Sequence, residues 1–493
     1  MNKLALFIFV LFPFFGFSQK DTVAHYYTFG SVANEEGEDV SATDDGGFAV
    51  IGSTASSGGG NSDIYFLKVD SLCNYQWSWA LGGTNNDWGY AIKQTFDKGF
   101  IIAASTNSYG NGGYDAMLLK RDSLGNFQWQ KTFGGNDWDF AYDVVQTFDS
   151  GFVFCGETYN NTNGFSDVYV VKTNSLGDTL WTRTIGGNLI DKGNALIETS
   201  DSSIVVAGIK NTITDSTQAY VLKFDKDGTL LWDSLFGGVK YENIFDVIEL
   251  QSGKYAFTGS SNSQNSNLDV YFIKLDTNGV LLSTNTIVTS GVNSNDDESK
   301  SLIQLQDGRL LLIGYTKTYG YAKKDVIINA VDENGNWAGI GVTLGYLEND
   351  EINSAIITTD GRIVLVGKTN SYGIGNNDLF LIRLDTIYQT NYFYQHIYLQ
   401  YEDIAPISVN ELYNINSGLI VYPNPVKSVL NIKTKNYPIF LNVYDNIGRK
   451  VFSSKIQQEN TAFNISFLQK GLYTLVFSNS LSIYETKKLV VTE

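Results

Sequence analysis

The chain is poor in cysteine and histidine, and each shortage excludes a class of protein. Its 493 residues include two Cys and two His, which are too few for a disulfide framework or a cysteine-based zinc site. Cys73 and Cys155 occupy different sequence contexts, so we expect no disulfide between them and a buried free thiol at Cys155. His25 and His396 leave little for a histidine-dependent active site.

Basic residues are also scarce. The chain has 34 Lys and Arg against 52 Asp and Glu, which gives a net charge of −18 and a pI near 4.6. Because so acidic a surface repels phosphate, we expect neither nucleic acid nor an anionic membrane surface as a partner. The 43% hydrophobic residues, with 30 Tyr and 30 Phe, supply a large core and exclude a disordered chain.

Long apolar runs are likewise absent, except at the start of the chain. Residues 1–19 (MNKLALFIFVLFPFFGFSQ) place one lysine before an apolar stretch and end in small and polar residues, which are the three parts of a secretory signal peptide. The apolar stretch is shorter than the roughly 18–20 residues that span a bilayer. We therefore predict a signal peptide over 1–19 and no transmembrane anchor after its removal.

A repeat of 51 to 55 residues fills most of the remaining chain. The segments 90–107 and 141–158 match closely (YAIKQTFDKGFIIAASTN and AYDVVQTFDSGFVFCGET), and so do the segments 115–135 and 167–187 that follow them. We therefore count seven copies of one unit. The small residue that closes the second apolar run of each copy is Gly52, Ala104, Gly156, Gly208, Gly259, Gly314 and Gly367.

Each unit has the pattern of four β-strands. Short apolar or alternating runs are separated by turn residues every 8–12 positions or so, and no run has helical spacing. The first turn is Gly-rich, as in DKG (97–99) and DSG (149–151), and we expect its glycine to supply a positive φ. The second turn has the form D-x-x-G, as at 122–125, where the Asp side chain can cap the turn.

Seven four-stranded units predict an all-β fold, a seven-bladed β-propeller over residues 20–390. A flat solenoid is the rival architecture. The segment YTFG (27–30) resembles KTFG (131–134), the fourth strand of a unit, yet it precedes the first complete unit, and the seventh unit lacks a fourth strand of its own. We therefore expect the N-terminal strand to complete the seventh blade and close the ring.

These GG-linked units resemble the bacterial seven-bladed propeller repeats often called SBBP, over about residues 25–390. The resemblance implies an extracellular module and no shared ligand. Tryptophan and lysine recur at fixed positions of the units, and we interpret the tryptophans as packing between blades and the lysines as forming salt bridges or covering a strand edge. They are Trp77, Trp129, Trp181 and Trp232, and Lys68, Lys120, Lys172, Lys223 and Lys274.

Proline is missing from the whole stretch 14–405 and returns at 406, 423, 425 and 438. Residues 391–418 fit no repeat, so we predict a linker there. Alternating strands with Gly turns follow over 419–493 and predict a second, small domain, an immunoglobulin-like β-sandwich.

The second domain contains YPNP, a V-x-D-x-x-G-R-x-V pattern, an L-x-K-G-x-Y motif and two late lysines. In these motifs it resembles the type A C-terminal sorting domain of the type IX secretion system. The resemblance implies export through the periplasm to the outer cell surface or the medium, with the secretion machinery and its sortase-like peptidase as partners. The residues that carry it are Pro423, Asn424, Pro425, Asp445, Gly448, Lys470, Gly471, Tyr473, Lys487 and Lys488.

Loops on one face of the predicted propeller are rich in Asn, Asp, Gly and aromatic residues. They are the loops between blades and the loops between second and third strands. Amide and carboxylate groups can bind sugar hydroxyls while Trp or Tyr rings cover the apolar side of a sugar, although such loops can also be plain solvated turns. The candidate ligand-binding residues are Trp88, Trp138, Tyr241, Tyr319 and Tyr372.

A second candidate set lies near the start of the first, channel-lining strand. Asp39, Asp143 and Asp246 occupy one repeat position, where the other units have Ala or Ser. The three carboxylates could surround a calcium ion or a ligand at the channel mouth, or they could cap local turns. No motif requires a cofactor.

Catalytic motifs are missing as well. The sequence has no H-E-x-x-H, no G-x-S-x-G and no sialidase-type box, so we predict no enzymatic activity and no catalytic residue. The leading function is an adhesion or binding module for glycan or protein ligands. Two alternatives stay open: a polysaccharide-acting enzyme that uses a carboxylate pair, and a purely structural surface protein.

Overall fold

The computed structural model describes residues 23–160, 165–212, 216–264, 267–287, 295–319, 323–373, 375–385, 398–400, 420–422, 426–434, 439–444, 450–478 and 483–492. Every regular element in these ranges is a β-strand, which confirms the all-β prediction. Within them, no helix is long and apolar enough to cross a membrane. The predicted signal peptide lies outside the described residues.

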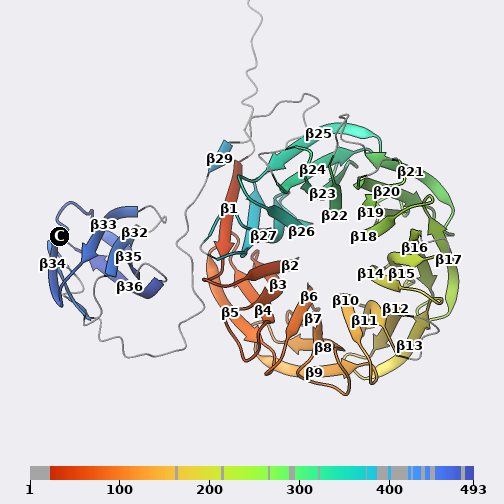
Figure 1. Cartoon of the computed structure of the whole chain (residues 1–493), viewed down its shortest axis with the longest axis horizontal. Coiled ribbons are helices and arrows are strands. Elements are labelled where there is room, and N and C mark those ends of the chain that lie inside the picture. Colours follow the sequence, from red (N-terminus) through yellow and green to blue (C-terminus); the bar gives the residue numbers. More distant parts are fainter. Residues whose placement is uncertain are drawn as a thin grey trace, which may run out of the picture.

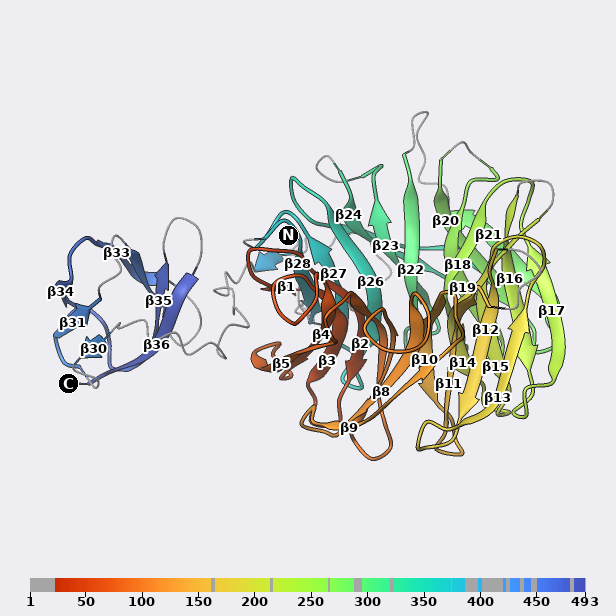
Figure 2. The same cartoon turned by 60° about the horizontal axis from the view of Figure 1, so that its bottom comes forward.

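Four-stranded antiparallel sheets surround a common centre, each with its first strand innermost (Figure 1). Figure 2 shows the strands running from one face of this ring to the other. The first three sheets, numbered in chain order, are β2 (Glu35–Ala42), β3 (Phe48–Thr54), β4 (Asp63–Val69) and β5 (Tyr75–Leu81); β6 (Asp87–Gln94), β7 (Phe100–Thr106), β8 (Asp115–Arg121) and β9 (Phe127–Phe133); and β10 (Asp139–Gln146), β11 (Phe152–Thr158), β12 (Asp167–Thr173) and β13 (Thr179–Ile185).

Three further sheets continue the ring with the same strand order. The arrangement is that of a β-propeller. These sheets are β14 (Asp191–Glu198), β15 (Ile204–Asn211), β16 (Thr217–Phe224) and β17 (Leu230–Phe236); β18 (Glu242–Glu249), β19 (Tyr255–Ser261), β20 (Asp269–Leu275) and β21 (Leu281–Ile287); and β22 (Asp297–Gln304), β23 (Leu310–Thr316), β24 (Asp325–Val331) and β25 (Trp337–Leu344).

The seventh sheet brings the two ends of this region together. Its strands lie in the order β26 (Asp350–Ile357), β27 (Ile363–Thr369), β28 (Asp378–Leu384), β1 (Val23–Phe29) and β29 (Tyr398–Gln400). β1 pairs antiparallel with β28, from Ala24 opposite Leu384 to Phe29 opposite Leu379, in the place of a fourth strand. β29 pairs parallel with β1, although the sequence predicted only a linker over 391–418.

The first hairpin turn takes its positive φ from glycine in some sheets, as predicted, with φ of +82° at Gly46, +89° at Gly308 and +84° at Gly361, but not in all of them. In the second and third sheets φ is +66° at Lys98 and +68° at Ser150, so the prediction that the following glycine supplies it is wrong there. The glycine is needed for space instead, because a Cβ at Gly99 would collide with the carbonyl oxygen of Arg121. The D-x-x-G turns do follow the prediction, with φ of +81° at Gly125.

Buried carboxylates hold the chain where one sheet meets the next. Asp87, at the start of β6, accepts the N–H of Gly83 at 2.8 Å and the hydroxyl of Ser108 at 2.7 Å. A Cβ at Gly82 would collide with both Asp87 and Asp63 of the preceding sheet, so the Gly-Gly pair after the outer strand lets two carboxylates close over the backbone. The N–H bond recurs from Gly135 to Asp139, from Gly187 to Asp191 and from Gly238 to Glu242.

The recurring tryptophans pack between sheets, as predicted. Trp77 of β5 meets Phe66 edge-on, with 4.9 Å between ring centroids, and borders the cluster that contains Leu119 of the next sheet. The glycine of the next D-x-x-G turn lies on its ring, because a Cβ at Gly125 would be 2.9 Å from Trp77. The same contact pairs Trp129 with Gly177, Trp181 with Gly228 and Trp232 with Gly279.

All five recurring lysines form ion pairs, in agreement with the salt-bridge interpretation: four of them pair with the first hairpin turn, and Lys274 pairs with Glu333 of the sixth sheet. The Lys172 side chain is 4% exposed and its Nζ lies 2.6 Å from Asp149, whose side chain is 56% exposed. Burial acts to raise the pKa of Asp149, but hydrogen bonds from Lys172 and Thr147 outweigh it and hold the pKa below its usual value. Equivalent pairs are Lys68–Asp45, Lys120–Asp97 and Lys223–Asp201.

A second group of strands builds two smaller antiparallel sheets. They are β30 (Ile420–Tyr422), β31 (Val429–Lys433) and β34 (Asn460–Asn464), and β33 (Lys450–Ile456), β32 (Ile439–Tyr444), β35 (Gly471–Ser478) and β36 (Ile483–Val491). Leu430 of the first sheet and Leu441 and Phe477 of the second belong to one buried cluster. Two sheets over one core form a β-sandwich.

The unequal exposure of Lys172 and Asp149 predicts unequal costs of removing either one. Asp149→Ala leaves the buried Nζ without its ion-pair partner, and we expect it to lower the unfolding free energy by about 3 kcal/mol. Lys172→Met leaves a carboxylate that water can reach, and we expect a loss of about 1 kcal/mol or less. Urea unfolding measures both. Alanine variants of the exposed pair Lys98–Asp44 are the control, and we expect each to lower the unfolding free energy by ~0.5 kcal/mol or less. Equal losses for the two test variants would contradict the prediction.

Candidate functional site

A bulge in each innermost strand turns two consecutive side chains toward the centre of the ring. The pairing with the second strand skips one residue, for example between Gly37 and Asp39 and between Ala141 and Asp143. A bulge of this kind sets two residues against one on the neighbouring strand. The central cavity, of about 560 Å³, is therefore bordered by consecutive pairs such as Glu38 and Asp39 from β2, β6, β10, β14, β18, β22 and β26.

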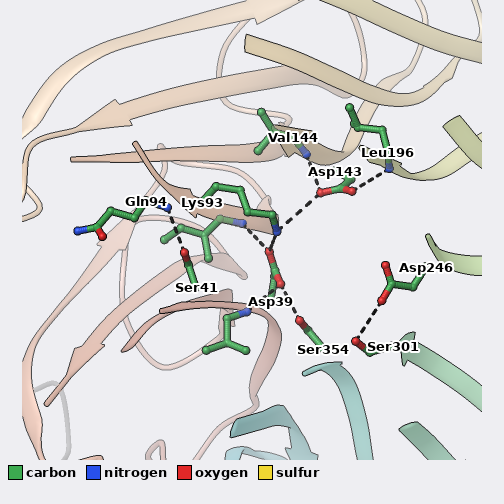
Figure 3. A network of polar contacts seen from close by, with 12 residues as sticks. Asp39, Ser41, Lys93, Gln94, Asp143, Val144, Leu196, Asp246, Ser301 and Ser354 are labelled. Carbon is green, nitrogen blue, oxygen red and sulfur yellow. Dashed lines mark hydrogen bonds and ion pairs between the residues drawn. The ribbon is translucent and has the colours of Figure 1, made fainter. Parts of the chain in front are cut away.

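The three candidate aspartates of the channel each join two neighbouring sheets (Figure 3). Asp143 accepts the N–H of Val144 at 2.8 Å within β10 and the N–H of Leu196 in β14 at 2.9 Å. Asp39 accepts the N–H of Ile92 in the next sheet at 2.9 Å, and Asp246 accepts the N–H of Leu302 in the next sheet at 2.8 Å. Each carboxylate thus caps one backbone donor beside it in its own strand and one in the next sheet.

Lys93, which the sequence analysis did not single out, lies between two of these aspartates. Its Nζ is 2.7 Å from Asp39 and 4.0 Å from Asp143 (Figure 3). Burial acts to lower the pKa of Lys93, but Asp39 and Asp143 outweigh it and keep the pKa above its usual value. The ammonium group therefore neutralises this side of the channel.

The other channel carboxylates hold their protons more tightly than usual. Burial raises the pKa of Asp143 to about 6, even though Lys93 opposes it. Burial raises the pKa of Asp246 to about 7, and the nearby charge of Asp143 adds to the effect. Burial also raises the pKa of Glu38 to about 7.

The channel does not fit the calcium ion that the sequence left open. Calcium binds roughly six to eight oxygen ligands, and a carboxylate can serve as one only through lone pairs that do not already accept hydrogen bonds. The oxygens of Asp39, Asp143 and Asp246 already accept backbone N–H groups, and Ser354 and Ser301 add hydroxyl donors to Asp39 and Asp246. In the part of the chain that the structure describes, no group of three or more His, Cys, Asp or Glu side chains is placed to hold a metal ion.

The loops on one face are tied to one another by backbone hydrogen bonds. The N–H of Asp139 donates to the carbonyl of Tyr114 in the preceding sheet at 2.7 Å, and the N–H of Tyr159 donates to the carbonyl of Trp138 at 2.8 Å. The loop between the second and third sheets is thus fixed to the second-to-third loops on both of its sides.

An aromatic cluster crosses this face at the second and third sheets. The rings of Trp88 and Tyr114 stack at 5.2 Å, those of Tyr114 and Phe140 at 5.7 Å, and those of Phe140 and Tyr142 at 5.8 Å. Tyr142 meets Tyr90 edge-on at 5.1 Å, and both line the central cavity. The stacked rings therefore run from the loops to the channel wall.

Trp138 is the exposed member of this cluster, with 52% of its surface accessible. Its ring lies edge-on to Tyr114 and to Tyr159, each at 6.0 Å. A Cβ at Gly113 would collide with the indole, so that glycine leaves room for it. The structure thus brings the predicted residues Trp88 and Trp138 into one cluster.

The other predicted aromatic residues lie elsewhere. Tyr372 packs on Tyr26 and Phe380 in the seventh sheet, at 5.5 and 5.6 Å. Tyr241 holds Asn243 through its hydroxyl at 3.0 Å. Tyr319 is 45% exposed and borders a separate cavity between the fifth and sixth sheets. The five aromatic candidates therefore do not form one site.

Tyr90, Tyr114, Phe140 and Tyr142 belong to the cluster but escaped the sequence analysis. Tyr90 and Tyr142 immediately precede the channel position of their units, where the bulge turns them inward. The signal was an aromatic residue at one repeat position in two consecutive units. This signal did not predict a channel-facing side chain, because ordinary strand alternation points a residue at this position away from the channel unless a bulge intervenes.

The sorting-domain residues fall into two groups. Tyr473 of β35 is buried and donates its hydroxyl to the carbonyl of Gln469 at 2.7 Å, beside Lys470 and Gly471. Lys487 and Lys488 lie in β36, which pairs with β35. Outside the described residues lie Pro423, Asn424, Pro425, Asp445 and Gly448.

The raised pKa of Asp246 predicts that the folded state loses stability as the pH rises from about 4 to about 8. An unfolded Asp titrates near ~3.9, whereas Asp246 keeps its proton to about 7, so the folded state binds more protons in this window. Stability therefore falls with rising pH, and Asp246→Asn should flatten the slope. Chemical unfolding at a series of pH values measures it. The exposed Asp227→Asn is the control, and an unchanged slope in Asp246→Asn would refute the prediction.

Two family models match this chain. One, described as a secretion system C-terminal sorting domain, matches residues 420–492. The other, described as a β-propeller domain of unknown function (DUF5122), matches residues 358–386. No curated protein matches.

Solved structures resemble the chain at low identity. PorZ, a surface component of the type IX secretion system of Porphyromonas gingivalis, is 10% identical over 92% of this chain and 70% of that chain, with a TM-score of 0.36. The Pan2 WD40 domain of Neurospora crassa is 10% identical over 75% of this chain and 97% of that chain, with a TM-score of 0.45. A gluconolactonase of Xanthomonas campestris is 10% identical over 73% of this chain and 99% of that chain, with a TM-score of 0.35.

These values transfer no activity, so the assignment rests on the family matches and on the strands themselves. The ring of four-stranded sheets agrees with the propeller match, and the sandwich at the C-terminal end agrees with the sorting-domain match. The chain is a β-propeller protein of the type IX secretion pathway, which its C-terminal sorting domain directs to the outer cell surface or the extracellular space.

Proposed function

We propose that the chain is a seven-bladed propeller, closed by β1, that binds glycans at the cell surface or outside the cell. The pairing of β1 with β28 and the contact of the seventh sheet with the first support the closed ring. We assign the propeller to 20–390, a linker to 391–418 and the sorting domain to 419–493. The signal peptide occupies 1–19.

The aromatic cluster around Trp138 carries the proposal of glycan binding. A sugar ring places its C–H groups on the face of an aromatic ring, and large exposed apolar surfaces on a soluble protein mark binding sites. Trp138 offers 52% of its surface while Tyr114 and Tyr159 hold its edges. The exposed indole is therefore fixed before any ligand arrives.

Polar anchors hold the buried end of the cluster in the same way. The indole N–H of Trp88 donates to Ser62 at 3.0 Å, and Asn86 donates to the hydroxyl of Tyr114 at 3.4 Å. Rings that are fixed in advance lose little conformational entropy on binding. Such a platform suits a weak but repeated contact with a polysaccharide.

The enzyme alternative has no comparable support. The channel aspartates Asp39, Asp143 and Asp246 are occupied by backbone N–H groups of two sheets, which is a structural task. A protein ligand remains an outcome of the binding test, because an exposed tryptophan also serves as a protein contact. A structural protein without a ligand is the outcome if the test finds no retention.

Replacing the exposed indole tests the proposal. Trp138→Ala should weaken retention of the propeller on a glycan array about tenfold, because it removes the stacking surface and leaves the loop bonds of its backbone intact. Phe148→Ala is the matched control, since Phe148 is 63% exposed in the opposite hairpin turn of the same sheet. Equal retention of the Trp138→Ala variant would refute a site at this cluster, and a blank array for the wild type would refute glycan binding.

Deleting residues 419–493 tests the delivery signal. The truncated chain should still leave the cytoplasm and should accumulate in the periplasm, because it lacks the sorting domain. Fractionation and protease accessibility on intact cells locate it. As the reciprocal control, residues 419–493 fused to an exported reporter should bring that reporter to the surface. Surface exposure of the truncated chain would contradict the assignment.

A further inference from the structure

A cavity of about 680 Å³ opens between the fifth and sixth sheets, away from the aromatic cluster and the channel. It lies along the outer strands β21 and β25, which are neighbours on the rim of the ring (Figure 1). The cavity shares no lining residue with the channel cavity. It is therefore a separate feature whose origin can be traced in the repeat.

The cavity lies where the first four sheets place a tryptophan against the sheet that follows each of them. In the second sheet Trp129 is paired with Lys120, and in the fifth sheet the residue paired with the equivalent Lys274 is Ser283. The D-x-x-G glycine of the next sheet, which elsewhere lies on the tryptophan, lies on Phe272 instead and borders the cavity. Replacing an indole with a hydroxymethyl group leaves the space open.

The facing residue has changed as well. Asn329 of β24 occupies a position that is aliphatic in the other six sheets, and it lines the cavity with 2% of its surface exposed. In four junctions this aliphatic residue belongs to the cluster on which the tryptophan packs. The equivalent residues are Leu67, Leu119, Val171, Leu222, Ile273 and Ile382.

Both changed residues carry buried polar atoms without a partner. The side-chain Nδ2 of Asn329 and the Oγ of Ser283 are shielded from solvent and make no hydrogen bond. A buried amide or hydroxyl without a partner costs free energy, about 1–3 kcal/mol in folded proteins. The position of Asn329 is aliphatic in the other six sheets, so its buried amide is explained by a ligand that accepts a hydrogen bond here.

The rim of the cavity supplies an aromatic surface. Trp337 is 57% exposed, and a Cβ at Gly341 would lie 2.9 Å from its Cη2, so glycine lets the indole lie across the strand. An irregularity in β25, where Val331 pairs with Trp337 and Ala330 with Ile340, creates this arrangement. Tyr319 borders the same cavity.

Among the described residues that line the cavity, none carries a charged side chain. Asn285, Thr286, Asn336 and Thr343 add amides and hydroxyls to Asn329, and Ile287 and Ile327 add apolar surface. A neutral ligand with many hydroxyl groups and one apolar ring face matches this set. We propose that the cavity between the fifth and sixth sheets binds the ring of a neutral hexopyranose, with Asn329 bonding its hydroxyls and Trp337 covering its ring face.

Ligand-observed NMR titration of the mature chain, residues 20–493, tests the proposal. The probes are the methyl glycosides of glucose, galactose, mannose and N-acetylglucosamine. A single hexose of about a dozen heavy atoms should reach a Kd of about 1 mM. Saturable binding of at least one probe is expected, and no binding of any probe by the wild-type chain overturns the proposal.

Two variants introduce the residue types that other sheets have at the positions of Ser283 and Asn329. Ser283→Trp should fill the cavity, and Asn329→Leu should remove the amide; each should weaken binding at least ~10-fold and raise the thermal unfolding temperature. If Ser283→Trp does not fold, Asn329→Leu alone decides. A folded variant that binds the probe with the wild-type Kd overturns the proposal.

A matched pair of aromatic variants tests the rim. Trp337→Ala should weaken binding, whereas Phe127→Ala should not, since Phe127 occupies the equivalent position of the second sheet and is 58% exposed. Equal effects of the two variants overturn the role of Trp337. None of these residues belongs to the cluster around Trp138, so a failure here is distinguishable from a failure of glycan binding there.

Discussion

The capping of backbone N–H groups by buried carboxylates at the junctions is the interaction on which the rest of the molecule depends. A sheet in a ring buries both faces only if its neighbours are held at a fixed distance. Asp87 holds the Gly-Gly segment at the loop face, and Asp143 holds the next sheet at the channel. Asp143 accepts N–H groups of two sheets, and Asp87 accepts the Ser108 hydroxyl in addition to its backbone donor.

The same junctions place the aromatic cluster. Trp88 and Phe140 follow the capping residues Asp87 and Asp139 directly in sequence, so each ring is positioned by the carboxylate beside it. The backbone bond from Asp139 to Tyr114 then fixes the ring between them. The aromatic surface at the loops is in this way held by hydrogen bonds between neighbouring sheets.

The repeat predicted the strands well because the pattern of apolar runs and turns is local. The tryptophan packing followed too, since a ring that recurs every unit must face a recurring neighbour. Features that depend on register did not follow: the inward turn of Tyr142 needs the bulge beside it, and the pairing of Lys93 with Asp39 joins two units. The sequence did not predict the cavity beside Asn329 for the same reason: Asn329 lies in the sixth unit, whereas the position without a tryptophan lies in the fifth.

The pairing in the seventh sheet also decides how the molecule carries tension. A pull from the C-terminal domain first reaches the short edge strand β29, which pairs with β1, and only then β28. That strand is not at an edge: it is hydrogen-bonded to β27 on one side and to β1 on the other. Two ladders must yield before β28 leaves the sheet, so once β29 has been released the load falls on an interior strand.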